Sequence, residues 1–299
     1  MNFTKLPLSL EKQADLLISR GMTGQRDLMI DRLRVVNYYR LSGYWFPCQN
    51  SDDSFRPGTS FEMVWDHYVF DRRLRLIVMD AVERLEVFVR TQVSYHHALA
   101  YGPFAYALDP QTLPNLLPEK YNDFLRRLRE EASRSREQFL AAFIKKYGDL
   151  HSLPPVWMAS EIMAFGTVVT FFTGLQTSIK QKIAAAWGVP DRVFESWLHT
   201  INSIRNICAH HGRLWNRKLP TQPLIPRKNK YPQWHSPSPV DNRYIYAGLC
   251  LCKWALDRIA PQSAWSARLR ALITVHPAIS LSDMGFPHGW ESSPIWSRT

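Results

Sequence analysis

The amino-acid sequence predicts an all-α protein, and three observations lead to this fold class. Apolar residues recur at helical spacing in most segments, whereas the alternation typical of half-buried strands is nearly absent. Residues that start and stop helices bracket these segments. Of the 299 residues, 45% are apolar and 13% aromatic, which is enough for a sizeable core and excludes disorder as the main state. This length suits about two domains or one large one.

The first segment, residues 1–60, is predicted to be a helical N-terminal region. Ser9 is a suitable N-cap for a helix that ends at Gly21, and a second helix covers residues 25–36. Residues 37–47 then read NYYRLSGYWFP, a segment dense in aromatic side chains, and a polar loop follows it.

The second segment, residues 61–217, is predicted to be the helical core of the protein. Its first helix, residues 61–100, gives the strongest helical signal, because its apolar side chains gather on one side. The polar side chains fall within a wedge of about 80° on the other side, and they are Glu83, Glu86, Arg90, Ser94 and His97. Further helices are expected over residues 119–147, 155–173, 178–187 and 191–215.

Two polar pairs on this first helix have simple interpretations. Glu86 and Arg90 are spaced i,i+4, which is typical of an ordinary ion pair on a helix surface. His67 and Asp71 lie one turn apart, but no third ligand is near them. We therefore interpret His67 and Asp71 as surface residues rather than as part of a metal site.

The helix predicted over residues 191–215 gathers ionisable side chains on one face. Within about 60° to 140° of Arg205 lie His199, Asn202, Asn206, His210, Arg213 and Arg217. Arg205, Asn206 and His210 suit phosphate chemistry, since Arg can clamp a phosphate, Asn can polarise a hydroxyl and His can move a proton. A solvated helix face with ordinary hydrogen bonds is the alternative. His211 falls beside the core face and is predicted to be a hydrogen-bonded structural histidine.

Positive charge is concentrated in one part of the chain. The 37 Lys and Arg exceed the 26 Asp and Glu by 11, and residues 196–240 contain no acidic residue. Seven positive charges lie in this window, on Arg205, Arg213, Arg217, Lys218, Arg227, Lys228 and Lys230. Its rings, which could stack on bases, are Trp197, Trp215, Tyr231 and Trp234. The window suits a polyanion-binding surface, and a basic face that keeps the protein soluble is the alternative.

The third segment, residues 218–299, is predicted to be a basic, Pro-rich arm followed by short helices. Six prolines lie between Lys218 and Val240, which excludes a regular helix there. Short helices are expected near residues 244–260 and 264–275.

Several classes of function are excluded by motifs that the sequence lacks. It contains no GxxxxGK loop, GxSxG elbow, HExxH or GxGxxG motif and no metal-ligand spacing, so neither a metal nor a cofactor is expected. The cysteines form no CxxC pair, and Cys250 and Cys252 lie in an apolar helix, so we expect a reduced, cytoplasmic chain. Residues 162–179 lack charge but contain four Thr, which favours a buried helix over a membrane span.

Residues 205–210, which read R-N-x-x-A-H, fit the Rx4–6H motif of HEPN ribonucleases, and the wider chain resembles the bacterial abortive-infection (Abi) family of the AbiD/AbiF type. Four stretches carry this resemblance: LPLSLEKQADLLISRG (6–21), NYYRLSGYWFP (37–47), FDRRLRLIVMDAVERLEVFVRTQVSYH (70–96) and SIRNICAHHGRLWNR (203–217). Their occurrence in this order is specific, whereas an Rx4H pattern alone is common by chance. Beyond Arg217 no signature of the family is seen.

The resemblance implies an HEPN-like helical bundle that cleaves RNA without a metal and acts as a toxin in phage defence. In such enzymes the 2′-hydroxyl of the RNA attacks the adjacent phosphate and leaves a cyclic phosphate end. By motif position, Arg205 would stabilise the developing charge, His210 would act as general acid or base, and Asn206 would orient His210 or the phosphate. The supporting residues would be Glu86, Arg90 and His211. HEPN nucleases often pair two motifs at a dimer interface, so a homodimer with a composite site is expected.

Two other hypotheses remain open. In one, the chain is a non-catalytic RNA-binding protein that holds a structured RNA. In the other, it is a protein–protein interaction domain that uses the aromatic segment 37–47. In the ribonuclease hypothesis and in the RNA-binding hypothesis, the RNA would be held by the same basic residues, which are Arg213, Arg217, Lys218, Arg227, Lys228 and Lys230.

Overall fold

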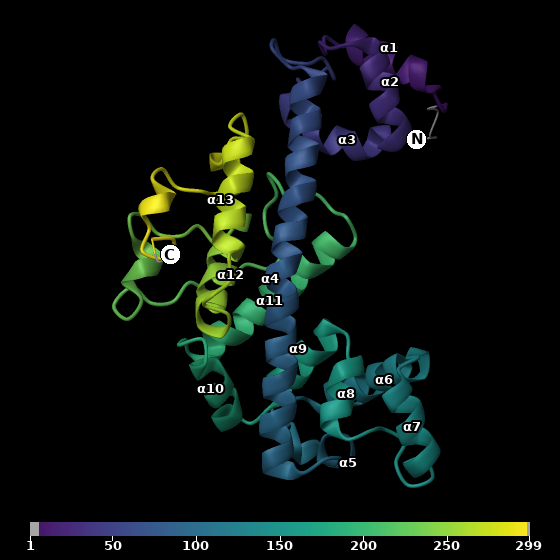
Figure 1. Ribbon diagram of the computed structural model, residues 1–299, viewed down its shortest axis with the longest axis vertical. Coiled ribbons are helices and arrows are strands. Elements are labelled where there is room, and N and C mark those ends of the chain that lie inside the picture. The colour runs from purple at the N-terminus through teal and green to yellow at the C-terminus, as the bar shows by residue number, and fades with distance from the viewer. Residues whose placement is uncertain (1–5, 298–299) are drawn as a thin grey trace.

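The computed structural model describes residues 6–297, which form an elongated all-α molecule (Figure 1). Thirteen α-helices and no β-strand lie in this part of the chain, which confirms the predicted fold class. The helices are α1 (Leu10–Ser19), α2 (Arg26–Val35), α3 (Tyr38–Trp45), α4 (Phe61–Tyr101), α5 (Ala105–Leu108), α6 (Pro118–Arg134), α7 (Gln138–Tyr147), α8 (Val156–Ile162), α9 (Phe165–Gly174), α10 (Thr177–Ala185), α11 (Asp191–Ala209), α12 (Ile245–Ile259) and α13 (Trp265–Val275). Residues 1–5 and 298–299, at the outer ends of the first and third predicted segments, lie outside the described residues.

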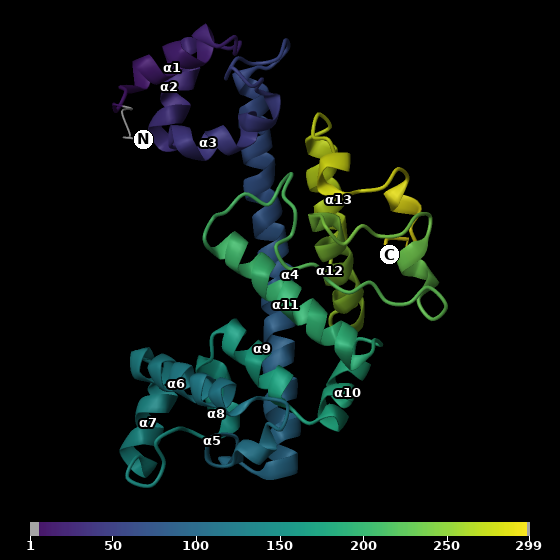
Figure 2. The same ribbon diagram turned by 180° about the vertical axis from the view of Figure 1, so that it is seen from behind.

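Helix α4 is the axis of the fold, and its 41 residues span roughly 60 Å. It starts at Ser60, whose hydroxyl accepts the Met63 amide, and stops at Gly102, where a φ of 84° suits glycine. Helices α1–α3 lie at one end of α4 and α5–α8 at the other (Figure 1). Helices α12 and α13 pack against α4, and α11 crosses it, as the view from behind shows (Figure 2).

The N-terminal region follows its prediction. The Ser9 hydroxyl accepts the Lys12 amide and caps α1, and α2 covers most of the predicted helix 25–36. The aromatic segment forms a helix of its own, because the Asn37 side chain accepts the Tyr39 amide at 2.8 Å and caps α3. This cap orders the segment as a helix whose Tyr39 ring stays 86% exposed.

Two predicted helices are each divided into two in the structure. Residues 119–147 form α6 and α7, which separate at Ser135, whose hydroxyl accepts the Glu137 amide in competition with the helical backbone. Residues 155–173 form α8 and α9, which separate at Met163, where an extended backbone turns the side chain into the core. Apolar residues recur at helical spacing on both sides of each break, so the sequence pattern does not predict either break.

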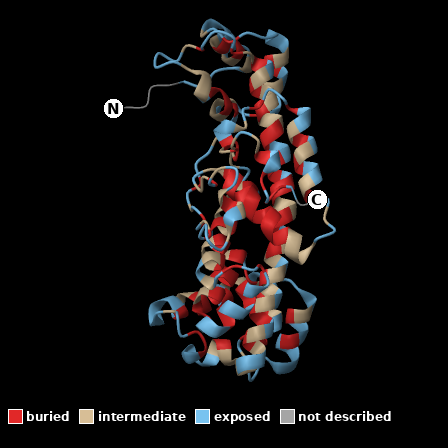
Figure 3. Cartoon of the chain, turned by 90° about the vertical axis from the view of Figure 1, so that its left-hand side faces the viewer, coloured by how far each residue is buried: buried red, intermediate tan, exposed pale blue. Residues whose placement is uncertain are grey.

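The core runs along α4, where α8, α9, α11, α12 and α13 pack against it (Figure 3). Cys250 and Cys252 of α12 are buried, as predicted, and burial raises the pKa of each thiol to about 12. Trp197, Trp215 and Trp234 are also in the core, each no more than 2% exposed. The prediction that these three rings stack on RNA bases is therefore wrong. No helix within residues 6–297 is both long and apolar enough to cross a bilayer.

Candidate functional site

Helix α11 carries the predicted catalytic residues at its C-terminal end. Its apolar face is buried, with Trp197 and Ile204 no more than 2% exposed, so the opposite face is turned outward. Arg205 lies at the border of the two faces, as predicted, and its side chain is 35% exposed. Asn206 and His210 are exposed. The guanidinium of Arg205 lies 3.5 Å from Asn206 Oδ1, so the first two residues of the motif are in contact.

Glu86 of α4 faces the motif and lies between two arginines. One of its carboxylate oxygens accepts a hydrogen bond from Arg90, and the other lies 3.9 Å from Arg205 Nε. Arg90 also donates to the carbonyl of Ser160. The side chains of Glu86 and Arg90 are only 16% and 12% exposed, so the pair is more deeply buried than the surface ion pair predicted from its spacing. The Glu86 carboxylate thereby pairs with the Arg205 guanidinium by charge, without a hydrogen bond to its Nε.

Helix α11 ends at Ala209 and not at the predicted Trp215, and His210 is its C-cap. The turn is closed by the two hydrogen bonds of a Schellman motif. Their donors are the amides of His211 and Gly212, and their acceptors are the carbonyls of Cys208 and Ile207, at 3.0 and 2.7 Å. His210 therefore lies at the very end of the helix. The predicted continuation of its polar face through Arg213 and Arg217 is wrong, because the chain has already left the helix there.

His211 takes up the left-handed conformation that this helix end requires, with a φ of 56°. Glycine is the usual residue in that place, because a Cβ strains the backbone by about 1–2 kcal/mol. The His211 carbonyl accepts a hydrogen bond from Arg40 Nη1 at 2.6 Å, and its side chain is exposed. The prediction of a structural histidine beside the core face is therefore wrong, because the contact is made by the backbone and not by the imidazole.

Asp71 of α4 fixes the loop that follows α11. Its Oδ1 accepts the amides of Leu214 and Trp215 at 2.9 and 2.6 Å, and its Oδ2 accepts hydrogen bonds from Tyr44 and Arg75. The side chain is completely buried, so the interpretation of Asp71 as a surface residue is wrong. Burial and the Asp71 carboxylate raise the pKa of the Tyr44 phenol, which therefore keeps the proton that it donates.

Helix α3 holds the same loop from the other side. Arg213 donates to the Gly43 carbonyl, and burial lowers the pKa of its guanidinium. The predicted RNA-binding residue Arg213 is therefore a half-buried side chain that ties the loop to α3. His67 is buried as well, with its ring centre 4.4 Å from that of Trp215, and is not the surface residue predicted from the sequence.

The loop and α3 together form a hollow of about 370 Å³ next to His210. Asn37, Tyr39 and Arg40 of the aromatic segment line it, together with His210 and Arg213. Sequence patterns do not reveal this neighbourhood, because the two sides of the hollow are about 170 positions apart along the chain. The sequence signal that could indicate this hollow is Arg40, a charged residue inside a segment rich in aromatic side chains.

The remaining predicted RNA-binding residues are all exposed and fall into two groups. The first group follows the loop directly and consists of Arg217 and Lys218. The second group follows Pro226 in the arm and consists of Arg227, Lys228 and Lys230.

The second group lies near the start of α11 rather than near the motif. Trp197 Nε1 donates to the Leu224 carbonyl at 2.9 Å, and the Trp234 ring packs 5.0 Å from that of Trp197, so the arm is fixed on both sides of the group. Trp197 and His210 are separated by roughly 20 Å along the helix axis. The basic window therefore does not surround the motif, as its continuity in the sequence suggests, but provides two separate positive surfaces.

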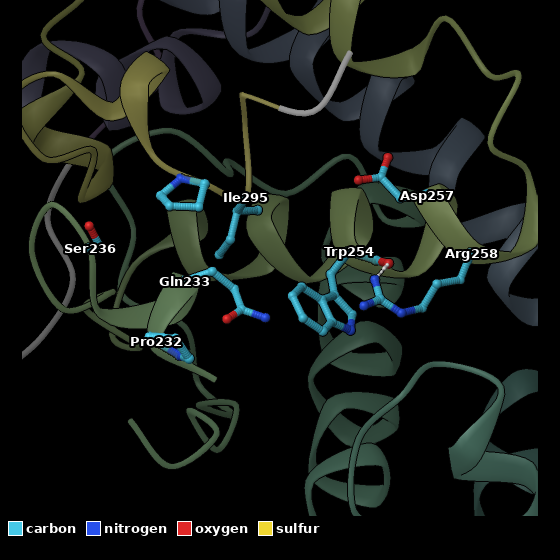
Figure 4. A pocket seen from close by; sticks show the side chains of 8 residues that line it. Pro232, Gln233, Ser236, Trp254, Asp257, Arg258 and Ile295 are labelled. Atoms are coloured by element: carbon cyan, nitrogen blue, oxygen red, sulfur yellow. Dashed lines mark hydrogen bonds between the residues drawn. The ribbon is translucent and has the colours of Figure 1, made fainter. Parts of the chain in front are cut away.

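A different hollow, of about 330 Å³, lies between residues 232–236 and α12 (Figure 4). The Arg258 guanidinium stacks 3.7 Å from the centre of the Trp254 ring and donates to the Trp254 carbonyl, and Asp257 accepts a hydrogen bond from Lys253. No residue of the R-N-x-x-A-H motif lines this hollow. In residues 6–297, no group of three or more His, Cys, Asp or Glu is arranged to hold a metal ion.

The fold and the site define an all-α protein in which an R-N-x-x-A-H sequence ends a helix that crosses a long axial helix. The model of one protein family, described as Abi-like protein, matches residues 31–216, which include the motif, Glu86 and both sides of the hollow beside His210. The chain belongs to this Abi-like family. No curated protein and no solved structure matches the chain. Membership of the family implies a part in abortive infection, a bacterial defence against phage.

Proposed function

We propose that the protein is a metal-independent endoribonuclease of the HEPN type that acts as a toxin in abortive infection. The observation that carries the proposal is the placement of Arg205 and His210 on α11. Arg205 is paired with Glu86 of α4, and His210 lies exposed at the C-terminal end of α11. An arginine stabilises negative charge on a phosphate and a histidine moves protons, which are the two requirements of RNA transesterification.

In the proposed reaction the RNA supplies its own nucleophile, the 2′-hydroxyl. Its oxygen forms a bond to the adjacent phosphorus as the bond from phosphorus to the 5′-oxygen breaks, which leaves a 2′,3′-cyclic phosphate and a 5′-hydroxyl. One proton leaves the 2′-hydroxyl and one proton reaches the 5′-oxygen, and His210 carries out such a transfer. Arg205 stabilises the negative charge that develops on the phosphate, and Asn206, in contact with Arg205, orients the phosphate or His210.

A homodimer with a composite site is part of the proposal. The reaction moves two protons, whereas one protomer presents a single His210, so the motif of a second copy supplies the second histidine. The exposure of Asn206 and His210 leaves the motif accessible to such a partner. Sedimentation should give twice the 34.8 kDa mass of the chain. A protein that sediments as a monomer under the conditions in which it cleaves RNA would contradict the composite site.

The direct test replaces the two residues that carry the proposal. Arg205→Ala and His210→Ala should each lower RNA cleavage by roughly 100-fold or more and abolish toxicity. His199 is an exposed histidine on the same helix, and His199→Ala is the control that should retain cleavage. Circular dichroism checks that each variant is folded, and sequencing of the RNA ends identifies the cleavage position. Unchanged cleavage and toxicity in both motif variants would overturn the proposal.

A second candidate function is non-catalytic binding of a structured RNA. The exposed side chains of Arg227, Lys228 and Lys230 favour it, because they lie far from the motif and have no part in the proposed chemistry. In that case RNA should co-purify intact, and its binding should weaken as the salt concentration rises. The RNA that co-purifies with Arg205→Ala should have the same length as the RNA bound to the wild type.

A further inference from the structure

We propose that the hollow beside His210 is a binding subsite for one nucleobase of single-stranded RNA, with Tyr39 as the ring on which the base stacks. This inference rests on the proposed ribonuclease function and deepens it, because it names the part of the substrate that is held next to the reacting phosphate. The subsite is built from the aromatic segment at one end of the molecule and the loop after α11.

The first observation is the exposure of Tyr39 on a fixed backbone. Its ring is 86% exposed, whereas Tyr44 and Trp45 of the same short helix are at most 2% exposed. The Tyr39 amide donates to the Asn37 side chain at 2.8 Å, and its carbonyl accepts from the Ser42 hydroxyl at 2.7 Å. The backbone that carries this ring is therefore fixed, and the ring is not used by the core, so it is free to serve as a stacking platform.

The second observation is the chemistry of the hollow. Arg40, His210, His211 and Arg213 line it together with Tyr39, and no carboxylate is among its lining residues. Its volume of about 370 Å³ lies within the range of small-molecule sites. A ring beside positive groups matches a nucleotide, which presents a flat base and a negative phosphate.

The third observation is the connection between the two sides of the hollow. Arg40 Nη1 donates to the His211 carbonyl at 2.6 Å, and Arg213 donates to the Gly43 carbonyl. The backbone that carries Tyr39 is therefore tied to the loop after His210, so a base that stacks on Tyr39 lies next to the motif. Single-stranded RNA is the form that fits, because only unpaired bases are free to turn out and stack on a protein ring.

The test measures binding of an RNA that cannot be cleaved. A short single-stranded RNA with 2′-O-methyl sugars and one 2-aminopurine base lacks the nucleophile, and its fluorescence reports stacking. Tyr39→Ala should weaken binding about tenfold and remove the fluorescence quenching, and Tyr39→Phe should restore both. Tyr95→Ala is the control, because Tyr95 is an exposed tyrosine on α4 that lines no part of the hollow. Thermal unfolding checks that the variants are folded.

The outcomes separate this inference from the proposed function. If Tyr39→Ala binds and quenches like the wild type, or if wild-type protein captures a protein through this surface and binds no RNA, the subsite is overturned. If Tyr39→Ala binds and quenches like the wild type but the wild type cleaves unmodified RNA, the subsite fails and the ribonuclease proposal survives. If Tyr39→Ala loses binding while the wild type does not cleave unmodified RNA, the subsite stands and the ribonuclease proposal fails.

Discussion

Glu86 acts on the motif from another helix, because its carboxylate lies between the guanidinium groups of Arg90 and Arg205. Neutralising it would leave two half-buried positive charges without their shared counterion. We expect Glu86→Gln to lower the free energy of unfolding by about 2 kcal/mol and, by releasing Arg205, to lower RNA cleavage about tenfold.

Glu83 provides a matched control on the same helix, because it is exposed and lies three positions earlier. Urea unfolding and a cleavage assay should show little change in Glu83→Gln. If the two variants behave alike, Arg205 does not depend on Glu86 for its position.

His97 gives the folded protein a dependence on pH. It is fully buried against the rings of Tyr101 and Phe171, neither ring nitrogen has a hydrogen-bond partner among the described residues, and burial lowers its pKa from 6.5 to about 4. The unfolded chain binds a proton on this histidine below pH 6.5, whereas the folded chain does not, so its contribution to stability is complete above that pH and is lost as the pH falls toward 4.

From about pH 7.5 to about pH 5, the free energy of unfolding should therefore fall by about 2 kcal/mol through His97 alone. Urea unfolding at the two pH values measures the loss. His97→Phe keeps an aromatic ring without a titratable group, and it should remove this part of the pH dependence. An equal loss in the variant would assign the effect to other groups.

At the scale of elements, Asp71 joins three parts of the chain that are far apart in the sequence. It receives hydrogen bonds from Tyr44 of α3, from Arg75 of α4 and from the loop amides of Leu214 and Trp215. Asp71→Asn leaves the buried Arg75 charge without its partner, so we expect a loss of about 3 kcal/mol in the free energy of unfolding. The partly exposed Asp80 is the control, and Asp80→Asn should lose less than about 1 kcal/mol. Equal losses would show that the buried network does not stabilise the loop.

The elements that the sequence predicts well are those whose apolar stripes decide their position. Helices α4 and α11 follow their periodicity, and the polar face shared by Arg205, Asn206 and His210, together with the resemblance of the wider chain, selects the candidate site. Periodicity could not show that Asp71 is buried, because it separates polar from apolar residues but does not distinguish a buried polar residue from an exposed one. The sequence does not predict that α11 ends at Ala209, although Gly212 follows shortly after, because the left-handed residue of this helix end is His211, where glycine is usual.

At the scale of the whole molecule, tertiary contacts determine where on the surface the positively charged residues lie. The hollow beside His210 joins residues about 170 positions apart, and no local pattern carries that information. The acid-free window, residues 196–240, is continuous in the sequence. In the fold, its later part returns from the motif to the first half of α11, where Trp197 contacts Leu224. The exposed positive charge is therefore spread along the molecule. If the proposed function holds, we expect an RNA strand at the motif to contact the arm as well.

Lys228 and Lys230 test this contact through the salt dependence of binding. Each phosphate contact to single-stranded RNA contributes about 0.7 to the slope of log affinity against log salt, so Lys228→Ala/Lys230→Ala should lower that slope by about 1.4. Fluorescence anisotropy with an uncleavable RNA, between about 50 and 200 mM salt, measures it. Lys145→Ala/Lys146→Ala removes the same charge from exposed positions on α7 and should leave the slope unchanged. If the arm variant keeps the wild-type slope, the RNA does not reach the arm, and its charge serves another purpose than binding this substrate.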